Sequence, residues 1–362
     1  MTELFRKSWT KKELLSYVGD TSALGGIRLA ELSDGPGRGV RLADVHTGAG
    51  LRCTVLIDRG LDIGYAAYNE IPIAFQASCG VRSPYFFDQE GYESLRNFHG
   101  GLLSLCGLSA AGHPSEDAFG KHGLHGRVSN TPAQSISVGD RWDGDEYEFW
   151  IGGQVRESWA LGFNLQMTRK ITARLGENRL HLRDTFENLG CEPAPLMLLY
   201  HCNFGFPLVA EGSELIVDDI SLKPRDPEAE KGMATHNRFE RPQPGYAEQV
   251  FYHEVRTGED GYATAAIVNR WLNAGEGLAA YVRWRQAELP ELIEWKQMGA
   301  VDYVVGLEPA NCYPEGRARE AERGTLRVLT PGEVVHTELE FGTLAQRDKI
   351  EALVHQVGGE TP

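Results

Sequence analysis

The sequence lacks a long apolar run and an excess of positive charge. A membrane-spanning helix needs about 18 or more predominantly apolar residues in a row, and no stretch of this chain approaches that length. The 362 residues include 51 acidic and only 36 basic side chains, for a net charge of −15. Because phosphate backbones and anionic lipids attract basic surfaces, this balance disfavours nucleic acid and membranes as partners.

Cysteine is also scarce, and its pattern excludes two common uses. The six cysteines form no CxxC pair and follow no regular spacing, so neither a zinc cluster nor a disulfide framework is indicated. Residues 1–7 (MTELFRK) carry charges without the apolar run that follows them in a secretory signal. We therefore expect a cytoplasmic protein with reduced thiols.

Glycine, by contrast, is plentiful, with 42 residues. Short stretches of alternating apolar and polar residues, such as 27–32 and 51–57, recur between Gly and Asp turns. Residues 166–175 and 179–186 alternate in the same way around Gly176-Glu177-Asn178, which predicts a hairpin with one buried and one wet face. The pattern predicts a mainly β protein, an antiparallel sandwich or barrel.

Three segments complete the predicted organisation. Residues 1–24 form an N-terminal helical extension, with a helix over 8–18 capped by Thr10, and Glu13 follows three residues later as in a capping box. Residues 25–345 form a single β domain, within which the proline-broken stretch 222–260 is expected to be a long loop. Residues 346–362 form a C-terminal tail that begins as a short helix.

One polar cluster stands out, in the stretch His122-Gly-Leu-His125-Gly-Arg127. Imidazole exchanges protons near neutral pH, and guanidinium offers a fork of donors to oxygen-rich ligands. Glycine allows backbone turns and close approach. The alternative interpretation is a polar turn whose histidines cap backbone groups.

Two later stretches place polar residues at the ends of apolar strands. His201-Cys202-Asn203-Phe204 ends a run of apolar residues, and Glu308 ends another before Pro309. Aromatic rings beside such polar groups suit sugars, which have apolar C–H patches and many hydroxyls. His201 and Cys202 also suggest a base and a thiol nucleophile, but adjacent strand residues point to opposite faces, which argues against that pair.

The order of these stretches resembles the galactose mutarotase-like superfamily, the aldose 1-epimerases. The closer resemblance is to a branch with the motifs DRGLDI, GGLLSLCGL, HGLHGR and NFGFPL, here at 58–63, 100–108, 122–127 and 203–208. It covers about residues 25–342 and implies a large antiparallel β-sandwich, the mutarotase-like supersandwich, with a few short helices and an open sugar cleft. The implied reaction opens and closes a sugar ring at its anomeric carbon, with one acid and one base and no metal or redox cofactor.

The resemblance also implies roles for individual residues. His201 matches the acid and Glu308 the base, and His125 matches the histidine that binds substrate. Glu248 lies in a Gly-Tyr-Ala-Glu stretch similar to the family's Gly-Tyr-Asp loop. The family's sugar-binding arginine has no counterpart in residues 100–107. The expected substrate-binding residues are His125, Arg127, His122, Asn203, Arg59, Glu248 and Asn311, with Arg127 or Arg59 in place of that arginine.

Two alternatives stay open at the level of sequence. The first is another carbohydrate isomerase or lyase on the same scaffold, with a divalent metal held by some of His99, His122, His125, His201 and Glu308. The second is a sugar-binding module without catalysis. Each takes a small-molecule carbohydrate as its partner, and a homodimer is one option for the oligomeric state.

Overall fold

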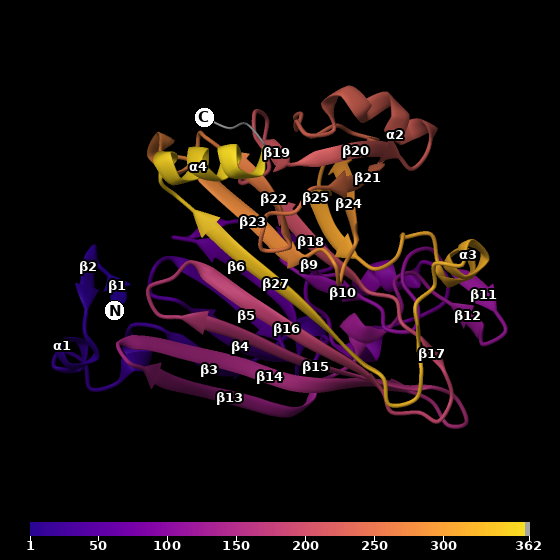
Figure 1. Cartoon of the computed structure of the whole chain (residues 1–362), viewed down its shortest axis with the longest axis horizontal. Coiled ribbons are helices and arrows are strands. Elements are labelled where there is room, and N and C mark those ends of the chain that lie inside the picture. The colour runs from indigo at the N-terminus through magenta and orange to yellow at the C-terminus, as the bar shows by residue number, and fades with distance from the viewer. Residues whose placement is uncertain (359–362) are drawn as a thin grey trace.

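Three antiparallel sheets dominate the fold of the computed structural model, which describes residues 1–358 (Figure 1). The predicted mainly β architecture is therefore confirmed. The largest sheet has eight strands, in the spatial order β13 (Gln134–Asp143), β14 (Glu146–Ser158), β15 (Asn164–Arg174), β16 (Arg179–Asn188), β27 (Val334–Leu344), β23 (Leu278–Arg285), β22 (Tyr262–Asn269) and β19 (Glu214–Val217).

The other two sheets have six and five strands. The six-stranded sheet runs β10 (Ser104–Cys106), β18 (Leu199–Gly205), β25 (Tyr303–Ala310), β24 (Glu291–Met298), β21 (Gln249–Val255) and β20 (Asp219–Pro224). The five-stranded sheet runs β3 (Gly26–Glu31), β4 (Arg41–His46), β5 (Leu51–Leu56), β6 (Asp62–Tyr68) and β7 (Ile71–Pro72). Single bridges between Ile63 and Leu103 and between Ala74 and Phe204 connect these two sheets.

Shorter elements join and cover the sheets. The strand pairs are β1 (Thr2–Leu4) with β2 (Lys7–Trp9), β8 (Phe75–Gln76) with β9 (Gly100–Gly101), β11 (Ser115–Asp117) with β12 (Gly120–His122), and β17 (Ala194–Pro195) with β26 (Val328–Leu329). The helices are α1 (Lys11–Leu15), α2 (Pro227–Gly232), α3 (Arg317–Arg323) and α4 (Arg347–Val357). The 3₁₀ turns are η1 (Thr21–Ala23), η2 (Gly35–Gly37), η3 (Pro84–Phe86), η4 (Glu93–Asn97), η5 (Val128–Asn130), η6 (Met233–Thr235) and η7 (Asn273–Gly275).

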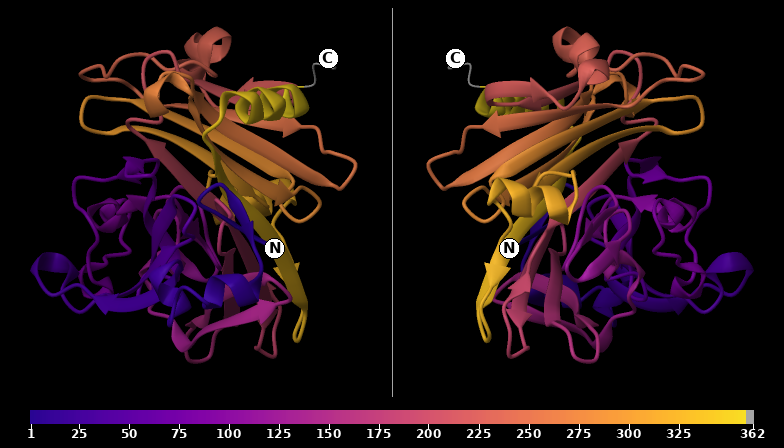
Figure 2. Two further views of the ribbon diagram at one scale, coloured as in Figure 1. Left: turned by 90° about the vertical axis from the view of Figure 1, so that its left-hand side faces the viewer. Right: turned by 90° about the vertical axis from the view of Figure 1, so that its right-hand side faces the viewer.

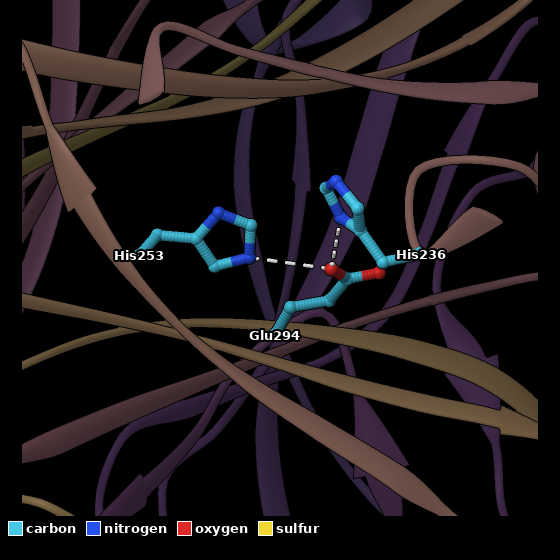
Figure 3. A group of neighbouring side chains, drawn as sticks. All are labelled: His236, His253 and Glu294. Atoms are coloured by element: carbon cyan, nitrogen blue, oxygen red, sulfur yellow. Dashed lines mark hydrogen bonds and ion pairs between the residues drawn. The ribbon is translucent and has the colours of Figure 1, made fainter. Parts of the chain in front are cut away.

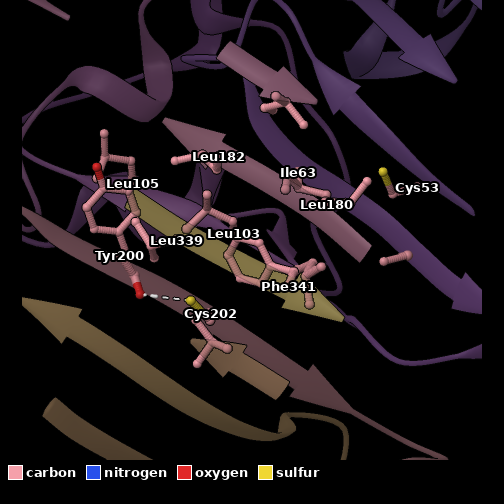
Figure 4. Close-up of a cluster of buried hydrophobic side chains, with 14 of the residues drawn as sticks. Cys53, Ile63, Leu103, Leu105, Leu180, Leu182, Tyr200, Cys202, Leu339 and Phe341 are labelled. Carbon is pink, nitrogen blue, oxygen red and sulfur yellow. Dashed lines mark hydrogen bonds between the residues drawn. The ribbon is translucent and has the colours of Figure 1, made fainter. Parts of the chain in front are cut away.

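The main core lies between the inward faces of the three sheets (Figure 4). The predicted hairpin of β15 and β16 is present, and its alternation buries Leu180 and Leu182 in that core. These residues pair across to Phe341 and Leu339 of β27. The N-terminal strands, in indigo and purple, lie in the lower part of both views in Figure 2, whereas α2 and α4 lie at the top.

Two local predictions need correction. The predicted helix over 8–18 covers only Lys11–Leu15, because residues 7–9 pair as strand β2, although the Thr10–Glu13 capping box is present as expected. The predicted loop 222–260 is interrupted by the second half of β20 and by helix α2. Asp226 caps α2 by accepting from the backbone N–H groups of residues 228 and 229, and Pro227 begins the helix.

The C-terminal tail is helical over Arg347–Val357, and its residues 359–362 lie outside the described part of the chain. Between residues 1 and 358, no helix combines the length and the apolar character that crossing a bilayer requires.

A buried charge network joins all three sheets. Arg169 on β15 donates two hydrogen bonds to Asp184 on β16, at 2.9 and 2.7 Å, and its Nη1 lies 3.4 Å from Asp62 on β6. The hydroxyl of Tyr200 on β18 donates to the same Asp184 carboxylate at 2.7 Å. The side chains of Arg169, Asp184 and Asp62 are fully buried, so each charge depends on its partners for stabilisation.

We expect Arg169→Met to destabilise the protein strongly, because it leaves two buried carboxylates without their cation. A loss of about 3–5 kcal/mol in the free energy of unfolding is typical when one partner of a buried pair is removed. The matched control is Arg183→Met on β16, whose partner Glu338 is only 2.9 Å away but whose own side chain is 71% exposed. Urea denaturation should show at most about 1 kcal/mol for the control, and equal losses in the two variants would contradict the structural role of Arg169.

Candidate functional site

A pocket opens on one face of the six-stranded sheet, and it contains four of the predicted site residues, His125, His201, Glu248 and Glu308. We call this the front face; it carries Ile293 and Trp295 of β24, which line the pocket. Strand alternation turns Glu294 and Lys296 to the back face. The pocket walls are largely apolar and aromatic, with Leu95, Phe98, Leu124, Val250, Ile293 and Trp295.

Strand register brings His201 and Glu308 together. On β18 and β25, Leu199 pairs with Ala310 and Cys202 with Leu307, which sets His201 directly across from Glu308. The Nε2 atom of His201 lies 3.2 Å from Oε1 of Glu308, and both side chains are almost fully buried. The two groups that resemblance selected as acid and base therefore form one contact, although they are about 100 residues apart in sequence.

The surroundings of this pair favour its uncharged forms. Burial, together with the nearby Glu248, raises the pKa of Glu308 to about 8, against an opposing effect of Arg225. Burial and the neighbouring His125 lower the pKa of His201 to about 3. At neutral pH the pair therefore holds one titratable proton, which lies on the carboxyl group of Glu308. Such opposed shifts in neighbouring groups are typical of acid–base sites.

Gly306 lies two residues before Glu308, and its lack of a side chain makes room for the side chains of His201 and Glu308. A Cβ atom at this position would lie 2.7 Å from Oε1 of Glu308 and 3.2 Å from Cε1 of His201. Any larger residue would therefore displace one member of the pair. The absence of a side chain here is a steric requirement of the site.

The HGLHGR motif delivers its second histidine to the pocket. His125 adopts a positive φ of 62°, and its ring centroid lies 5.6 Å from that of His201. The flanking Gly123 and Gly126 have no room for a Cβ, which would clash with backbone oxygens of Gln89 and Ala110. These glycines therefore allow the loop to pack against the protein's own backbone, and this packing aims His125 at His201.

A second polar group on the pocket rim joins the predicted Glu248 to two residues that the sequence did not single out. Arg225 donates to Glu248 at 3.1 Å, and the indole N–H of Trp295 donates to the other Glu248 oxygen at 2.8 Å. The Trp295 ring also lies edge-on to His201, with centroids 5.2 Å apart. The position of Arg225 at the pocket makes it the structural candidate for the arginine that residues 100–107 lack.

Five residues of the predicted substrate-binding set lie outside this pocket, namely Arg59, Arg127, Asn203, Asn311 and His122. Arg59 is buried and donates to the carbonyls of Arg82, Asn97 and Ser129, and Arg127 is exposed on the surface. The side-chain amide of Asn311 binds the backbone between β17 and β18, where its Oδ1 accepts from the N–H of Leu198 and its Nδ2 donates to the carbonyl of Leu196. Asn203 is fully buried, and its Nδ2 donates to the carbonyl of His201.

The remaining histidines of the motif region are also turned elsewhere. His122 is buried against Asp117 and the guanidinium of Arg317, so it belongs to a contact between the β11–β12 hairpin and α3. His99 is fully buried, with neither ring nitrogen hydrogen-bonded. Cys202, the alternative nucleophile, lies on the back face in the main core, and burial raises the pKa of its thiol far above the usual range.

Within the described residues, the metal ligands that the sequence offered as an alternative (His99, His122, His125, His201 and Glu308) do not supply three ligand atoms to one compact group. We looked for groups of three or more His, Cys, Asp or Glu side chains whose ligand atoms all lie within 4.8 Å of one another. Within residues 1–358, His236, His253 and Glu294 form such a group. None of these belongs to the predicted set. They lie on the back face of the same sheet.

Sequence reasoning missed Trp295, Arg225, Tyr92, His113 and Phe98 among the residues of the pocket. For Trp295 a signal existed, because alternation through ELIEWKQM puts Ile293 and Trp295 on one face. Arg225 lies between two prolines in the stretch predicted as a loop, and no local pattern of that stretch indicates a pocket.

Comparisons with known proteins identify the family and the fold of the chain. The profile of a family described as "Domain of unknown function (DUF4432)" matches residues 37–343. A Klebsiella pneumoniae protein described as a candidate aldose 1-epimerase superimposes with a TM-score of 0.86 at 25% identity, over 94% of this chain and 91% of its own. No curated protein matches the sequence.

More distant structures share the fold alone. A galactose mutarotase-like protein from Clostridium acetobutylicum has a TM-score of 0.59 at 12% identity, over 88% of this chain and 98% of its own. Galactose 1-epimerase from Lactobacillus acidophilus has a TM-score of 0.54 at 14% identity, over 88% and 99%. The resemblance to the galactose mutarotase-like fold is thus confirmed.

The raised pKa of Glu308 predicts that Glu308→Gln stabilises the protein at alkaline pH. The folded-state pKa of about 8 exceeds the ordinary value of 4.5, so Glu308 costs stability progressively as pH rises from about 4.5 to 8. Glutamine removes that cost, and we expect a gain of roughly 1–4 kcal/mol at pH 8.5. Thermal denaturation of both proteins at pH 5 and pH 8.5 measures this, with little difference expected at pH 5. A variant less stable than wild type at pH 8.5 would contradict the assignment.

Proposed function

The chain belongs to the family described as Domain of unknown function (DUF4432), and on the geometry of its pocket we propose that it is an aldose 1-epimerase-like enzyme, which interconverts the anomers of a sugar. The observation that carries this proposal is the direct contact between His201 and Glu308 in a buried, aromatic-walled pocket. The similarity to a candidate aldose 1-epimerase over nine-tenths of both chains supports it.

In the proposed reaction, Glu308 removes the proton of the C1 hydroxyl while His201 donates a proton to the ring oxygen. The C1–O bond to the ring oxygen breaks, and the open-chain aldehyde forms. Rotation about C1–C2 turns the carbonyl over, and the reverse proton transfers close the ring as the other anomer.

The proton count of the pair fits this cycle. Ring opening requires the single proton on His201, and it ends with that proton on the sugar and the C1 proton on Glu308. The pair therefore holds one proton before and after the step. Because Nε2 and Oε1 are 3.2 Å apart, the resting proton can first move directly from Glu308 to His201 to give the reactive form, and ring closure restores that form.

The other pocket residues are suited to holding a sugar ring. The faces and edges of Trp295 and Phe98 offer apolar contact to the C–H side of a pyranose or furanose. Arg225 has donors that its bonds to Asp226 and Glu248 do not use, and these can reach hydroxyl oxygens at the pocket. His125 completes the wall on the side of His201. The proposed chemistry uses only these side chains and needs no metal or redox cofactor.

We expect Glu308→Gln and His201→Asn to lower kcat for mutarotation by roughly 10²–10⁴-fold, the usual contribution of a general acid or base. The assay is polarimetry or exchange NMR over a panel of aldoses, corrected for the spontaneous rate. Cys202→Ala is the matched control, because it neighbours His201 but faces the core. Absence of acceleration by wild-type protein for every aldose, or full activity in Glu308→Gln, would contradict the proposal.

The pH dependence of kcat/KM distinguishes a proton-sharing pair from a lone base. If the pair must hold one proton, loss of that proton with a pKa of about 8 removes the acid form. We therefore expect a plateau between about pH 5 and 7 and a decline of about tenfold per pH unit above 8. A rate that rises through pH 8 would instead mean that Glu308 acts without His201 as the acid.

A further inference from the structure

A second group of polar side chains lies on the back face of the six-stranded sheet, opposite the pocket. His253 on β21, Glu294 on β24 and His236 in the turn after η6 point toward one another (Figure 3). The side chains of His253 and Glu294 are fully buried, and that of His236 is 13% exposed. The proposed sugar chemistry uses none of the three.

The distances within this group are those of ligands around one small cation. Nδ1 of His236 lies 2.9 Å and Nε2 of His253 lies 3.2 Å from Oε2 of Glu294. Zinc binds nitrogen and oxygen at about 2.0–2.2 Å in a tetrahedron, so its ligand atoms lie on the order of 3.3 Å apart. Little movement would be needed to place an ion between these atoms.

Two further observations indicate a site that is prepared for an ion. Nδ1 of His253 lies 2.8 Å from Oδ1 of Asp219, the carboxylate–histidine arrangement that aims the opposite ring nitrogen at a metal. The other Glu294 oxygen, Oε1, is buried without any hydrogen-bond partner. A buried carboxylate oxygen costs free energy unless a donor or a cation satisfies it.

The segment that supplies His236 is already held in place by a neighbouring side chain. Lys296, two residues after Glu294 on the same face, donates to the carbonyls of Thr235 and Arg238 at 2.9 and 2.7 Å. These bonds fix the backbone on both sides of His236. The three candidate ligands therefore come from preorganised elements.

We propose that His236, His253 and Glu294 bind a divalent transition-metal ion of the Zn²⁺ type, which fastens the segment from α2 to residue 240 onto the back of β21 and β24. Two imidazoles and one carboxylate favour zinc and its first-row neighbours over Mg²⁺ or Ca²⁺, which prefer oxygen ligands only. The ion is structural, because the sheet separates it from His201 and Glu308. The inference goes beyond the proposed function and does not depend on the substrate.

The test is Zn²⁺ binding by the full-length protein after chelator treatment and dialysis. Isothermal titration with ZnCl₂ should give one site per chain, elemental analysis one equivalent after removal of excess, and added Zn²⁺ should raise Tm. Co²⁺ in place of Zn²⁺ should give the visible absorption of a site of low coordination number.

Variants locate the ion. We expect His236→Gln and Glu294→Gln to abolish stoichiometric binding, and Asp219→Asn to weaken it roughly 10–100-fold. His236 and Asp219 are partly exposed, so these two variants keep the test valid if Glu294→Gln does not fold. The controls are Glu308→Gln on the front face and His181→Gln, a surface histidine 3.4 Å from Glu340, and both should bind Zn²⁺ like wild type.

Two outcomes would overturn the inference. The first is wild-type protein that takes up less than stoichiometric Zn²⁺ and shows no change in Tm, which would mean that the three side chains form a hydrogen-bonded network without an ion. The second is binding that survives in His236→Gln but disappears in Glu308→Gln, which would place the ion in the front pocket.

Discussion

The pairing of Arg169 with Asp184 and Asp62 is the contact on which the arrangement of the sheets depends. Taking a guanidinium and two carboxylates out of water is costly, and the cost is offset only if all of them stay in register. Because the partners come from β6, β15 and β16, with Tyr200 of β18 bound to the same carboxylate, the network specifies one relative position of the three sheets. His201 follows Tyr200 directly, so the position of the catalytic candidate is fixed by this buried ion pair beneath it.

In the pocket, by contrast, a buried carboxyl group has no cationic partner in direct contact. Whereas Arg169 has carboxylate partners, Glu308 is buried with only a neutral imidazole at hydrogen-bonding distance, and its pKa rises in consequence. Such a carboxyl group lowers the stability of the folded protein at alkaline pH. It also titrates close to neutral pH, where it can give and take a proton. The contact of Glu308 with His201 also requires Gly306, because a Cβ atom at that position would displace one of the two side chains. The two buried sites thus differ in how their carboxylates are stabilised, by a guanidinium at Asp184 and by a bound proton at Glu308.

Much of the fold could be predicted from local pattern, because antiparallel strands with one wet face carry their alternation in the sequence, as the hairpin of β15 and β16 does. The contact of His201 with Glu308 required the family resemblance, because strand order and register between β18 and β25 leave no local trace. Arg59 and Arg127 were sound chemical candidates, but which donors are used by backbone carbonyls depends on packing that local sequence does not encode. The Asp226-Pro227 start of α2 was present in the sequence and was overlooked within a stretch predicted as a loop.

Strand β24 carries consecutive residues with unrelated tasks, since Trp295 lines the pocket while Glu294 and Lys296 face the back. A change in length is therefore more damaging here than a change in side chain. Insertion or deletion of a single residue within Glu291–Met298 would exchange the two faces and present a carboxylate to the pocket and an indole to the buried histidines. We therefore expect the fold to accept changes in length only in the turns on either side of β24.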